Sequence, residues 1–303
     1  RKDKRGISMR INSFCLTCLI DSQERQIRAF DDEEKKVRYM QEILAFLGSC
    51  SPQASAPELV KPLSAIYEKY WGKKDGMADV KREFNDYLLS MEETLEERIR
   101  SCRDPLEAAL CFARTGNYID YSAVKDVSRD QLLKLFEEQQ KEGLDPVEYQ
   151  KLLKDLEGAS SLIYLTDNCG EVVLDKLAIR LIKEIYPGLE IRAIVRGAPV
   201  VNDVDLEAAR YVGLDREVPV LENGSDIAGT VLEYLTPEVR RQIETADVIL
   251  SKGQGNFETI HGCGLNIYYL FLCKCDWFMR QFQARHFQGM LVNEKRIKNQ
   301  EIL

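Results

Sequence analysis

The sequence lacks the features that place a protein in a membrane or on a nucleic acid. It contains no run of about 18 apolar residues, so no transmembrane helix is expected. The basic start at residues 1–10 is not followed by an apolar core of signal-peptide length, so no secretory signal is expected. No long basic block is present and the formal net charge is −8, which argues against nucleic acid as a partner. We therefore expect neither a membrane nor a nucleic acid as partner, and the oligomeric state stays open.

Cysteine is too sparse for a fold that depends on disulfides. Nine cysteines, an odd number, are scattered over 303 residues, whereas secreted disulfide frameworks are shorter and denser. This pattern favours a reducing compartment, and we predict a cytoplasmic location. The pair Cys15-x-x-Cys18 stands at the start of a helical segment rather than beside a βαβ unit, which disfavours a thioredoxin-type role. Structural thiols, a second metal site and a redox pair remain open for these two cysteines.

Residues 1–157 are predicted to form an all-helical amino-terminal domain or cap. Apolar residues recur there mostly three or four positions apart, and strand-like alternation is nearly absent. The segment Ser49–Pro62 is rich in Pro, Ser and Ala and is predicted to be a loop. The helices are expected at Ile20–Leu47, Leu63–Tyr70, Val80–Ile99, Leu106–Arg114, Leu132–Gln140 and Val147–Leu156.

Residues 158–303 are predicted to form an α/β domain with a mostly parallel, doubly wound sheet. From Gly158 onward short apolar strands alternate with helices, which is the pattern of such sheets. The continuous apolar run Ile267–Leu272 indicates a central strand that is buried on both faces. The other strands are expected at Leu162–Leu165, Ile191–Val195, Glu217–Leu221 and Asp247–Leu250, with an edge strand at Met290–Val292.

Polar side chains follow several of these strands at the point where each strand ends. They are Asp167 and Asn168 after the first strand, Arg196, Gly197, Asn202 and Asp203 after the second, Ser251 to Asn256 after the fourth, and Lys274 after the last apolar run. The carboxyl ends of parallel strands meet at one edge of a sheet, so these side chains are expected to converge. Two carboxylates and an amide suit a divalent cation, while two lysines and glycine-rich backbone N–H groups suit a phosphate. The combination favours phosphoryl transfer or hydrolysis.

Each part of this set also has a structural interpretation. Asp167 or Asn168 is equally suited to cap the following helix. The segment Ser251 to Gly255 does not match the P-loop pattern, and a glycine-rich turn after a strand is often purely structural. His261 and His286 show no metal-ligand spacing and are interpreted as structural, with a place for His261 in the pocket as the alternative. Cys169 is expected to be a small packed residue.

Taken together, the motifs resemble the damage-control phosphatases, a family once catalogued as domain of unknown function 89. The resemblance extends from about Cys15 to Cys275 and follows the family in order and spacing. It is carried by Asp167-Asn168-x-Gly170-Glu171, Asn202-Asp203, Lys252-Gly253-Gln254-Gly255-Asn256-Phe257-Glu258, Lys274-Cys275, Gly116-Asn117-Tyr118-Ile119-Asp120 and Cys15-x-x-Cys18, the last being typical of the prokaryotic-type branch. The segment 277–283 is bulkier and more aromatic than is usual in the family, which leaves substrate choice or oligomer contacts in doubt.

The resemblance implies a Rossmann-like α/β domain and a metal-dependent phosphatase that hydrolyses phosphomonoesters of small metabolites, such as sugar phosphates or damaged phosphometabolites. By analogy with the family, one divalent ion (Mg²⁺, Mn²⁺, Co²⁺ or Ni²⁺) is held by Asp167, Asn168 and Asp203. The catalytic set is then Asp167, Asn168, Asp203 and Lys252. The phosphate or substrate ligands are Glu171, Lys252, Gly253, Gln254, Gly255, Asn256 and Lys274, with Asn117 and Asp120 reaching the pocket from the helical region. Direct attack by water is favoured over a phospho-enzyme.

Two other functions compete with this interpretation. A Rossmann-like fold is also compatible with an S-adenosylmethionine-dependent carboxyl methyltransferase, although no clear Gly-x-Gly-x-x-Gly follows the first strand. A non-catalytic protein that binds a metal or metabolite through the cysteine pair is the other alternative. The presence of the complete polar set argues against the second alternative, because a binding protein without activity does not need all of it.

Overall fold

The structure is a computed structural model that describes residues 9–73, 77–116 and 129–297. Within these ranges a six-stranded sheet has the strand order β3-β2-β1-β4-β5-β6. Neighbouring strands from β3 through β5 pair in parallel, and β6 is an antiparallel edge strand beside β5. The strands are β1 (Ser161–Leu165), β2 (Glu190–Val195), β3 (Val220–Glu222), β4 (Val248–Lys252), β5 (Ile267–Leu272) and β6 (Gly289–Asn293).

This strand order confirms the predicted doubly wound α/β class and locates its topological switch point. The chain runs outward from β1 to β2 and β3, and outward on the other side from β4 to β5. Adjacent loops therefore diverge at the carboxyl ends of β1 and β4, which is where open α/β sheets bind ligands. The run Ile267–Leu272 is buried along its whole length as predicted, but it is the second strand from the edge and not a central one.

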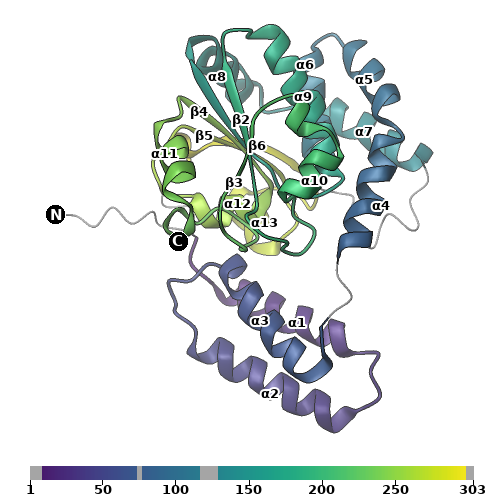
Figure 1. The fold of residues 1–303 in the computed structure, drawn as a ribbon, viewed down its shortest axis with the longest axis vertical. Coiled ribbons are helices and arrows are strands. Elements are labelled where there is room, and N and C mark those ends of the chain that lie inside the picture. The colour runs from purple at the N-terminus through teal and green to yellow at the C-terminus, as the bar shows by residue number, and fades with distance from the viewer. Residues whose placement is uncertain (1–8, 74–76, 117–128, 298–303) are drawn as a thin grey trace, which may run out of the picture.

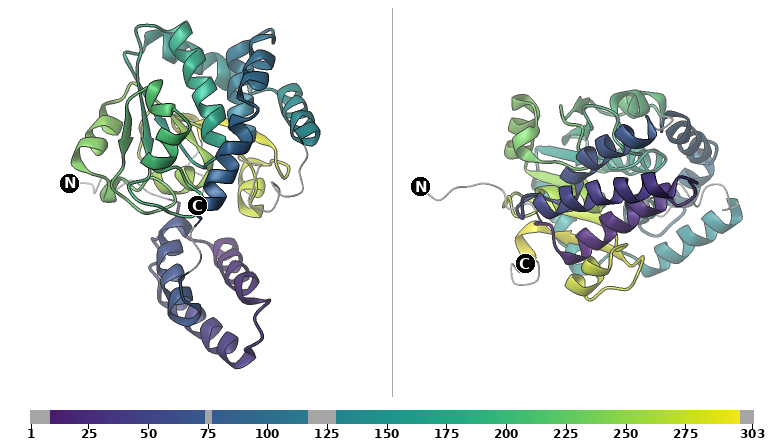
Figure 2. Two further views of the ribbon diagram at one scale, coloured as in Figure 1. Left: turned by 45° about the vertical axis from the view of Figure 1, so that its right-hand side comes forward. Right: turned by 90° about the horizontal axis from the view of Figure 1, so that it is seen from below.

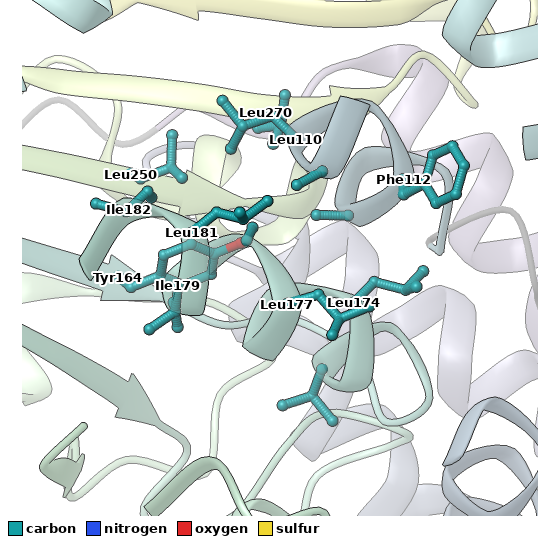
Figure 3. Close-up of a cluster of buried hydrophobic side chains, with 14 of the residues drawn as sticks. Leu110, Phe112, Tyr164, Leu174, Leu177, Ile179, Leu181, Ile182, Leu250 and Leu270 are labelled. Atoms are coloured by element: carbon teal, nitrogen blue, oxygen red, sulfur yellow. The ribbon is translucent and has the colours of Figure 1, made fainter. Parts of the chain in front are cut away.

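Helices cover both faces of the sheet. One face packs against α6 (Pro105–Thr115) and α9 (Glu171–Ile185), and Figure 3 shows leucines of both helices meeting Leu250 and Leu270 of the sheet. Around them lie α4 (Ala78–Leu89), α5 (Glu92–Arg100), α7 (Arg129–Glu142), α8 (Pro146–Gly158) and α10 (Leu206–Tyr211). The other core cluster involves α11 (Pro237–Thr245), α12 (Gly253–Ile260) and α13 (Asp276–Phe282). Short 3₁₀ turns occupy Leu214–Arg216, Leu232–Tyr234 and Glu294–Arg296.

The first three helices form a bundle of their own below the sheet domain (Figures 1 and 2). They are α1 (Ser13–Ile27), α2 (Glu33–Ser49) and α3 (Ala56–Trp71), with a separate core that includes Tyr39 and Leu63. The later helices α4 to α8 instead share the main core with the sheet. The helical half of the chain is thus divided spatially, and the domain boundary at residues 157 and 158 stays a prediction.

Several predicted helix boundaries are wrong, and each has a local cause. The segment Ile20–Leu47 is two helices, because Asp32 begins α2 by accepting a hydrogen bond from the Lys35 N–H at 2.9 Å. The predicted loop Ser49–Pro62 already contains the start of α3. There the Ser55 N–H and hydroxyl both donate to Glu58 at 2.7 Å, and this capping interaction outweighs the local content of proline.

Three further elements differ from prediction. The segment Val80–Ile99 is divided at Ser90 and Met91 into α4 and α5. The third strand is displaced to Val220–Glu222, because the N–H groups of Glu217 and Val218 donate to the Leu214 carbonyl and continue the preceding 3₁₀ turn. The glycine-rich segment expected to be a loop instead ends β4 with Lys252 and opens α12 with Gly253. Among the described helices none has the length and apolar character needed to cross a membrane.

Candidate functional site

The first group of site residues meets at the switch point between β1 and β4. Asp167 follows β1, and Gly253 opens α12 directly after β4. A Cβ atom at Gly253 would lie only 1.9 Å from Asp167 Oδ2, and Gly253 has a positive φ of 76°. Glycine at this position therefore allows the Asp167 carboxylate to lie directly against the backbone that starts the helix.

A short backbone pairing joins the loops that follow β1 and β2. Asn168 and Asp203 form an antiparallel bridge, and the Val204 N–H donates to the Asp167 carbonyl at 2.9 Å. The side-chain amide of Asn168 donates to Asp167 Oδ2 at 2.8 Å. The structure thus brings together Asp167, Asn168 and Asp203, the three residues expected to hold a metal. Gly170 is the N-cap residue of α9, and its N–H donates to Asn85 Oδ1 at 2.7 Å, so neither Asp167 nor Asn168 occupies the N-cap position.

Arg196 contacts the two aspartates of this group, Asp167 and Asp203, from a buried position. The sequence did not suggest this role. The fully buried guanidinium of Arg196 donates from Nε to Asp203 Oδ2 at 2.6 Å and lies 3.7 Å from Asp167 Oδ1. It also donates to Asn256 Oδ1 at 3.1 Å, and Asn256 in turn donates to the carbonyls of Thr166 and Lys252. Asn256 therefore ties α12 to the ends of β1 and β4. Arg196 directly follows an apolar strand, and a cation at that position was the signal in the sequence that could have indicated its role.

Lys252 is buried away from the site opening. Its ammonium group bonds to Glu171, to Asp175 Oδ1 at 2.6 Å and to the Ala113 carbonyl at 2.9 Å, which uses all three of its donors. The contact of Lys252 and Glu171 with phosphate, implied by the family resemblance, stays a prediction. Asp175 was missed, although its place four residues after Glu171 on one helix face predicts that the two carboxylates lie together.

Carboxyl groups outnumber the cations that are bonded to them in this cluster. In the described part of the chain, Arg196 and Lys252 form its ion pairs. The carboxyl groups are Asp167, Glu171, Asp175, Asp203 and Glu258. Burial raises the pKa of Asp203 to about 6 and the pKa of Glu258 to about 8, and the negative charge of Asp167 adds to both increases. These carboxyl groups therefore hold their protons more tightly than exposed carboxyls do, and a bound cation would favour their ionised forms.

The donor atoms also suit a hard divalent cation. Neither Asn168 Oδ1 nor Asp203 Oδ1 accepts a hydrogen bond from any described residue, so both oxygens are free to act as ligands. No group of three His, Cys, Asp or Glu side chains in the described ranges forms a metal site by itself. The ligand set of two carboxylates and one amide stays a prediction.

A cleft of about 300 Å³ opens beside these carboxylates. Its sheet-side wall includes Asp167, Asp203 and Glu258, and its opposite wall is formed by Leu19 of α1 together with Ala56, Pro57 and Val60 of α3. The three-helix bundle thus covers the carboxyl edge of the sheet, as its place in Figure 1 indicates. The volume is that of a pocket for a small metabolite. Glu258 was quoted in the family motif but was given no role.

Among the remaining predicted residues, Lys274 does not line the 300 Å³ cleft. Lys274 lines a second cleft, of about 690 Å³, on the other side of α1, and its N–H donates to Gln254 Oε1 at 3.0 Å. Asn117 and Asp120 lie outside the described residues. Gly116, which precedes them, lies so close to Glu171 that a Cβ atom would be 3.0 Å from the Glu171 Cα.

The structure also shows the burial of the cysteines and the contacts of His261. All nine cysteines are free thiols, with Cys15 buried and Cys18 exposed on α1. Cys169 is buried, as expected of a packed residue. His261 Nδ1 lies 2.7 Å from Glu294 Oε2, and its ring stacks on Phe257 with centroids 4.8 Å apart. These contacts confirm the structural interpretation of His261.

Comparisons with known proteins agree with this arrangement. Residues 11–288 match the model of the damage-control phosphatase ARMT1-like domain. A damage-control phosphatase of Archaeoglobus fulgidus is 28% identical over 276 residues, which cover 88% of this chain and 93% of the relative. One from Pyrococcus horikoshii is 26% identical over 279 residues, covering 91% and 95% of the two chains. An uncharacterized protein of Methanocaldococcus jannaschii is 27% identical over 289 residues, covering 89% and 91%.

The fold itself is similar to that of a solved structure. The crystal structure of a DUF89 family protein from Pyrococcus horikoshii superimposes with a TM-score of 0.78 at 26% sequence identity. The similarity covers 95% of this chain and 100% of that chain. The resemblance first drawn from motifs therefore extends over the sheet, the helices that cover it and the amino-terminal bundle.

Proposed function

Because the chain belongs to the damage-control phosphatase ARMT1-like family, we propose that it hydrolyses phosphomonoesters of small metabolites with the help of one divalent metal ion. Sugar phosphates and damaged phosphometabolites are the substrate classes we propose, which makes the role one of metabolite repair. The observation that carries the proposal is the meeting of Asp167, Asn168 and Asp203 at the switch point, beside a cleft of metabolite size.

Asp167, Asn168 and Asp203 would hold the metal ion through oxygen atoms. When bound, the ion supplies Lewis-acid chemistry, offsetting the negative charge of a phosphoryl group. The oxygen set suits Mg²⁺ and Mn²⁺, and Co²⁺ and Ni²⁺ also bind such sites. The high ratio of carboxyl groups to cations in the cluster supports this assignment, because burial and the nearby charge of Asp167 raise the pKa of Asp203, and a divalent cation would favour its ionised form.

The remaining residues of the cluster position these ligands. Arg196 orients Asp203 through a buried 2.6 Å hydrogen bond, and Lys252 fixes Glu171 and Asp175 on α9. Gly253 lets the Asp167 carboxylate lie against the start of α12. Residues of α1 and α3 supply an apolar part of the cleft lining. We favour direct attack of water on phosphorus, because the two site aspartates in the cleft wall are assigned to the metal.

The test is phosphate release from a panel of sugar phosphates and related phosphoesters. Chelator-treated protein receives Mg²⁺, Mn²⁺, Co²⁺ or Ni²⁺ singly, and Asp203→Asn is compared with Asp215→Asn, which changes an exposed aspartate away from the cleft. We expect metal-dependent release by the wild type and Asp215→Asn, and loss in Asp203→Asn. No release from folded protein with any metal, together with thermal stabilisation by S-adenosylmethionine, would favour the methyltransferase instead.

A further inference from the structure

Three thiols gather where α1 packs against the segment that follows β5. Cys15 and Cys18 stand one helical turn apart on α1, and Cys275 immediately precedes α13. Cys18 and Cys275 line the same cleft of about 690 Å³. Cys15 is buried in a hydrophobic cluster with Trp277 and Phe278 of α13, and Cys275 packs against that cluster. Cys275 was quoted in the family motif but was given no role.

The contact between α1 and α13 holds this arrangement in place. Arg280 of α13 lies over the ring of Phe14 of α1, 4.6 Å from its centroid. Burial raises the pKa of the Cys18 thiol, and charge on Cys275 is the next contribution. Cys18 is exposed and Cys275 is half-buried, so both are accessible to a small oxidant.

We propose that Cys18 and Cys275 form a reversible disulfide that fastens the amino-terminal bundle to the sheet domain. With hydrogen peroxide as oxidant, the O–O bond breaks and the S–S bond forms. The two thiols lose their hydrogens and two electrons, and two molecules of water leave. A dithiol reductant returns the pair to thiols by exchange through a mixed disulfide.

The proposed bridge would lie next to residues of the candidate active site. Leu19, the neighbour of Cys18, lines the 300 Å³ cleft, and Lys274, the neighbour of Cys275, is a predicted phosphate ligand. A bridge at this point fixes the helical wall of the cleft relative to the sheet. This consequence rests on the proposed phosphatase function, whereas formation of the disulfide does not.

The disulfide is tested by peptide mapping of the full chain after brief treatment with hydrogen peroxide, without reductant. Trypsin releases Cys15 and Cys18 together in residues 11–25, and releases Cys275 in residues 275–280, apart from Cys273. We expect a cross-linked pair of these peptides, absent in Cys18→Ser and in Cys275→Ser but retained in Cys15→Ser and in the control Cys50→Ser. A bridge between Cys15 and Cys18, or oxidation of Cys18 to the sulfinic acid without a bridge, would overturn the proposal.

Phosphate release before and after oxidation tests the consequence separately. We expect a several-fold loss of rate in the wild type, full recovery with dithiothreitol, and no loss in Cys18→Ser. Formation of the cross-linked peptide with an unchanged rate would refute the effect on the cleft. If neither the oxidised nor the reduced protein releases phosphate, the proposed function fails, and the mapping result still decides whether the disulfide forms.

Discussion

Replacing Lys252 by methionine is the most direct test of the buried charge cluster. The substitution keeps a long apolar side chain but removes the ammonium group that bonds to Glu171, to Asp175 and to the Ala113 carbonyl. All three side chains of this ion cluster are inaccessible to solvent. Two buried carboxyl groups would then lose their shared cation. We expect a large loss of stability, because breaking a buried ion pair from one side typically costs about 3–5 kcal/mol.

The loss should depend on pH in a definite direction. Burial already raises the pKa of Glu171 to about 8, although Lys252 opposes this, and removing Lys252 raises the pKa further. A carboxyl group whose pKa is higher in the folded state than in the unfolded state binds more protons when folded, so its stability contribution falls as pH rises. The variant should therefore lose most stability near pH 8 and least near pH 5, where Glu171 and Asp175 are protonated in the folded variant.

The assay is urea unfolding of the metal-free protein at pH 5 to 8, with Lys176→Met as the matched control. Lys176 is also buried and bonds to Glu92 at 2.9 Å, but the Glu92 side chain remains 20% exposed and can be hydrated after the change. We expect the control to lose about 1–2 kcal/mol with little dependence on pH. Equal losses in the two variants, or a Lys252→Met loss that does not change with pH, would refute the reasoning. Adding Glu171→Gln to Lys252→Met should recover part of the loss.

Three other substitutions test separate parts of the structure. Gly253→Ala should abolish metal-stimulated turnover, because the new methyl group would lie 1.9 Å from Asp167 Oδ2. Metal titration should show that this variant has lost metal binding, whereas the control Gly188→Ala, which has open space around the new methyl group, should bind the metal normally. Asp167→Ala should remove metal-dependent turnover with an unchanged circular dichroism spectrum, and retained activity would exclude Asp167 from the metal site. The hydrogen bond from His261 lowers the pKa of Glu294, although burial acts in the opposite direction. The Glu294 carboxylate therefore stabilises the fold at pH values above its pKa in the unfolded chain, and this stabilisation is lost as the pH falls. Glu294→Gln should cost about 1.5–3 kcal/mol at pH 7 in urea unfolding, and a gap to the wild type that persists below about pH 4 would contradict this.

The sequence was sufficient for the order of the elements and for the place of the site. The apolar run at Leu162–Leu165, followed by polar residues and then by helical periodicity, is a local pattern, and it yielded β1 and α9 nearly as the structure has them. Parallel strands deliver their carboxyl ends to one edge, so the meeting of Asp167 and Asp203 followed from the strand pattern. Helix boundaries were less certain, because a single capping interaction such as Ser55 with Glu58 changes where a helix begins.

What the tertiary structure decided is which polar groups are hidden and which share a cavity. Sequence position after a strand did not distinguish Lys252, which is sealed beneath Glu171 and Asp175, from Lys274, which borders a cleft. Nor did it bring Cys18 close to Cys275. Burial and the meeting of distant segments depend on how helices pack over the sheet, and that packing is the summed result of many weak contacts. The sequence by itself determined the chemistry available at the sheet edge, and the packing determined which side chains reach it.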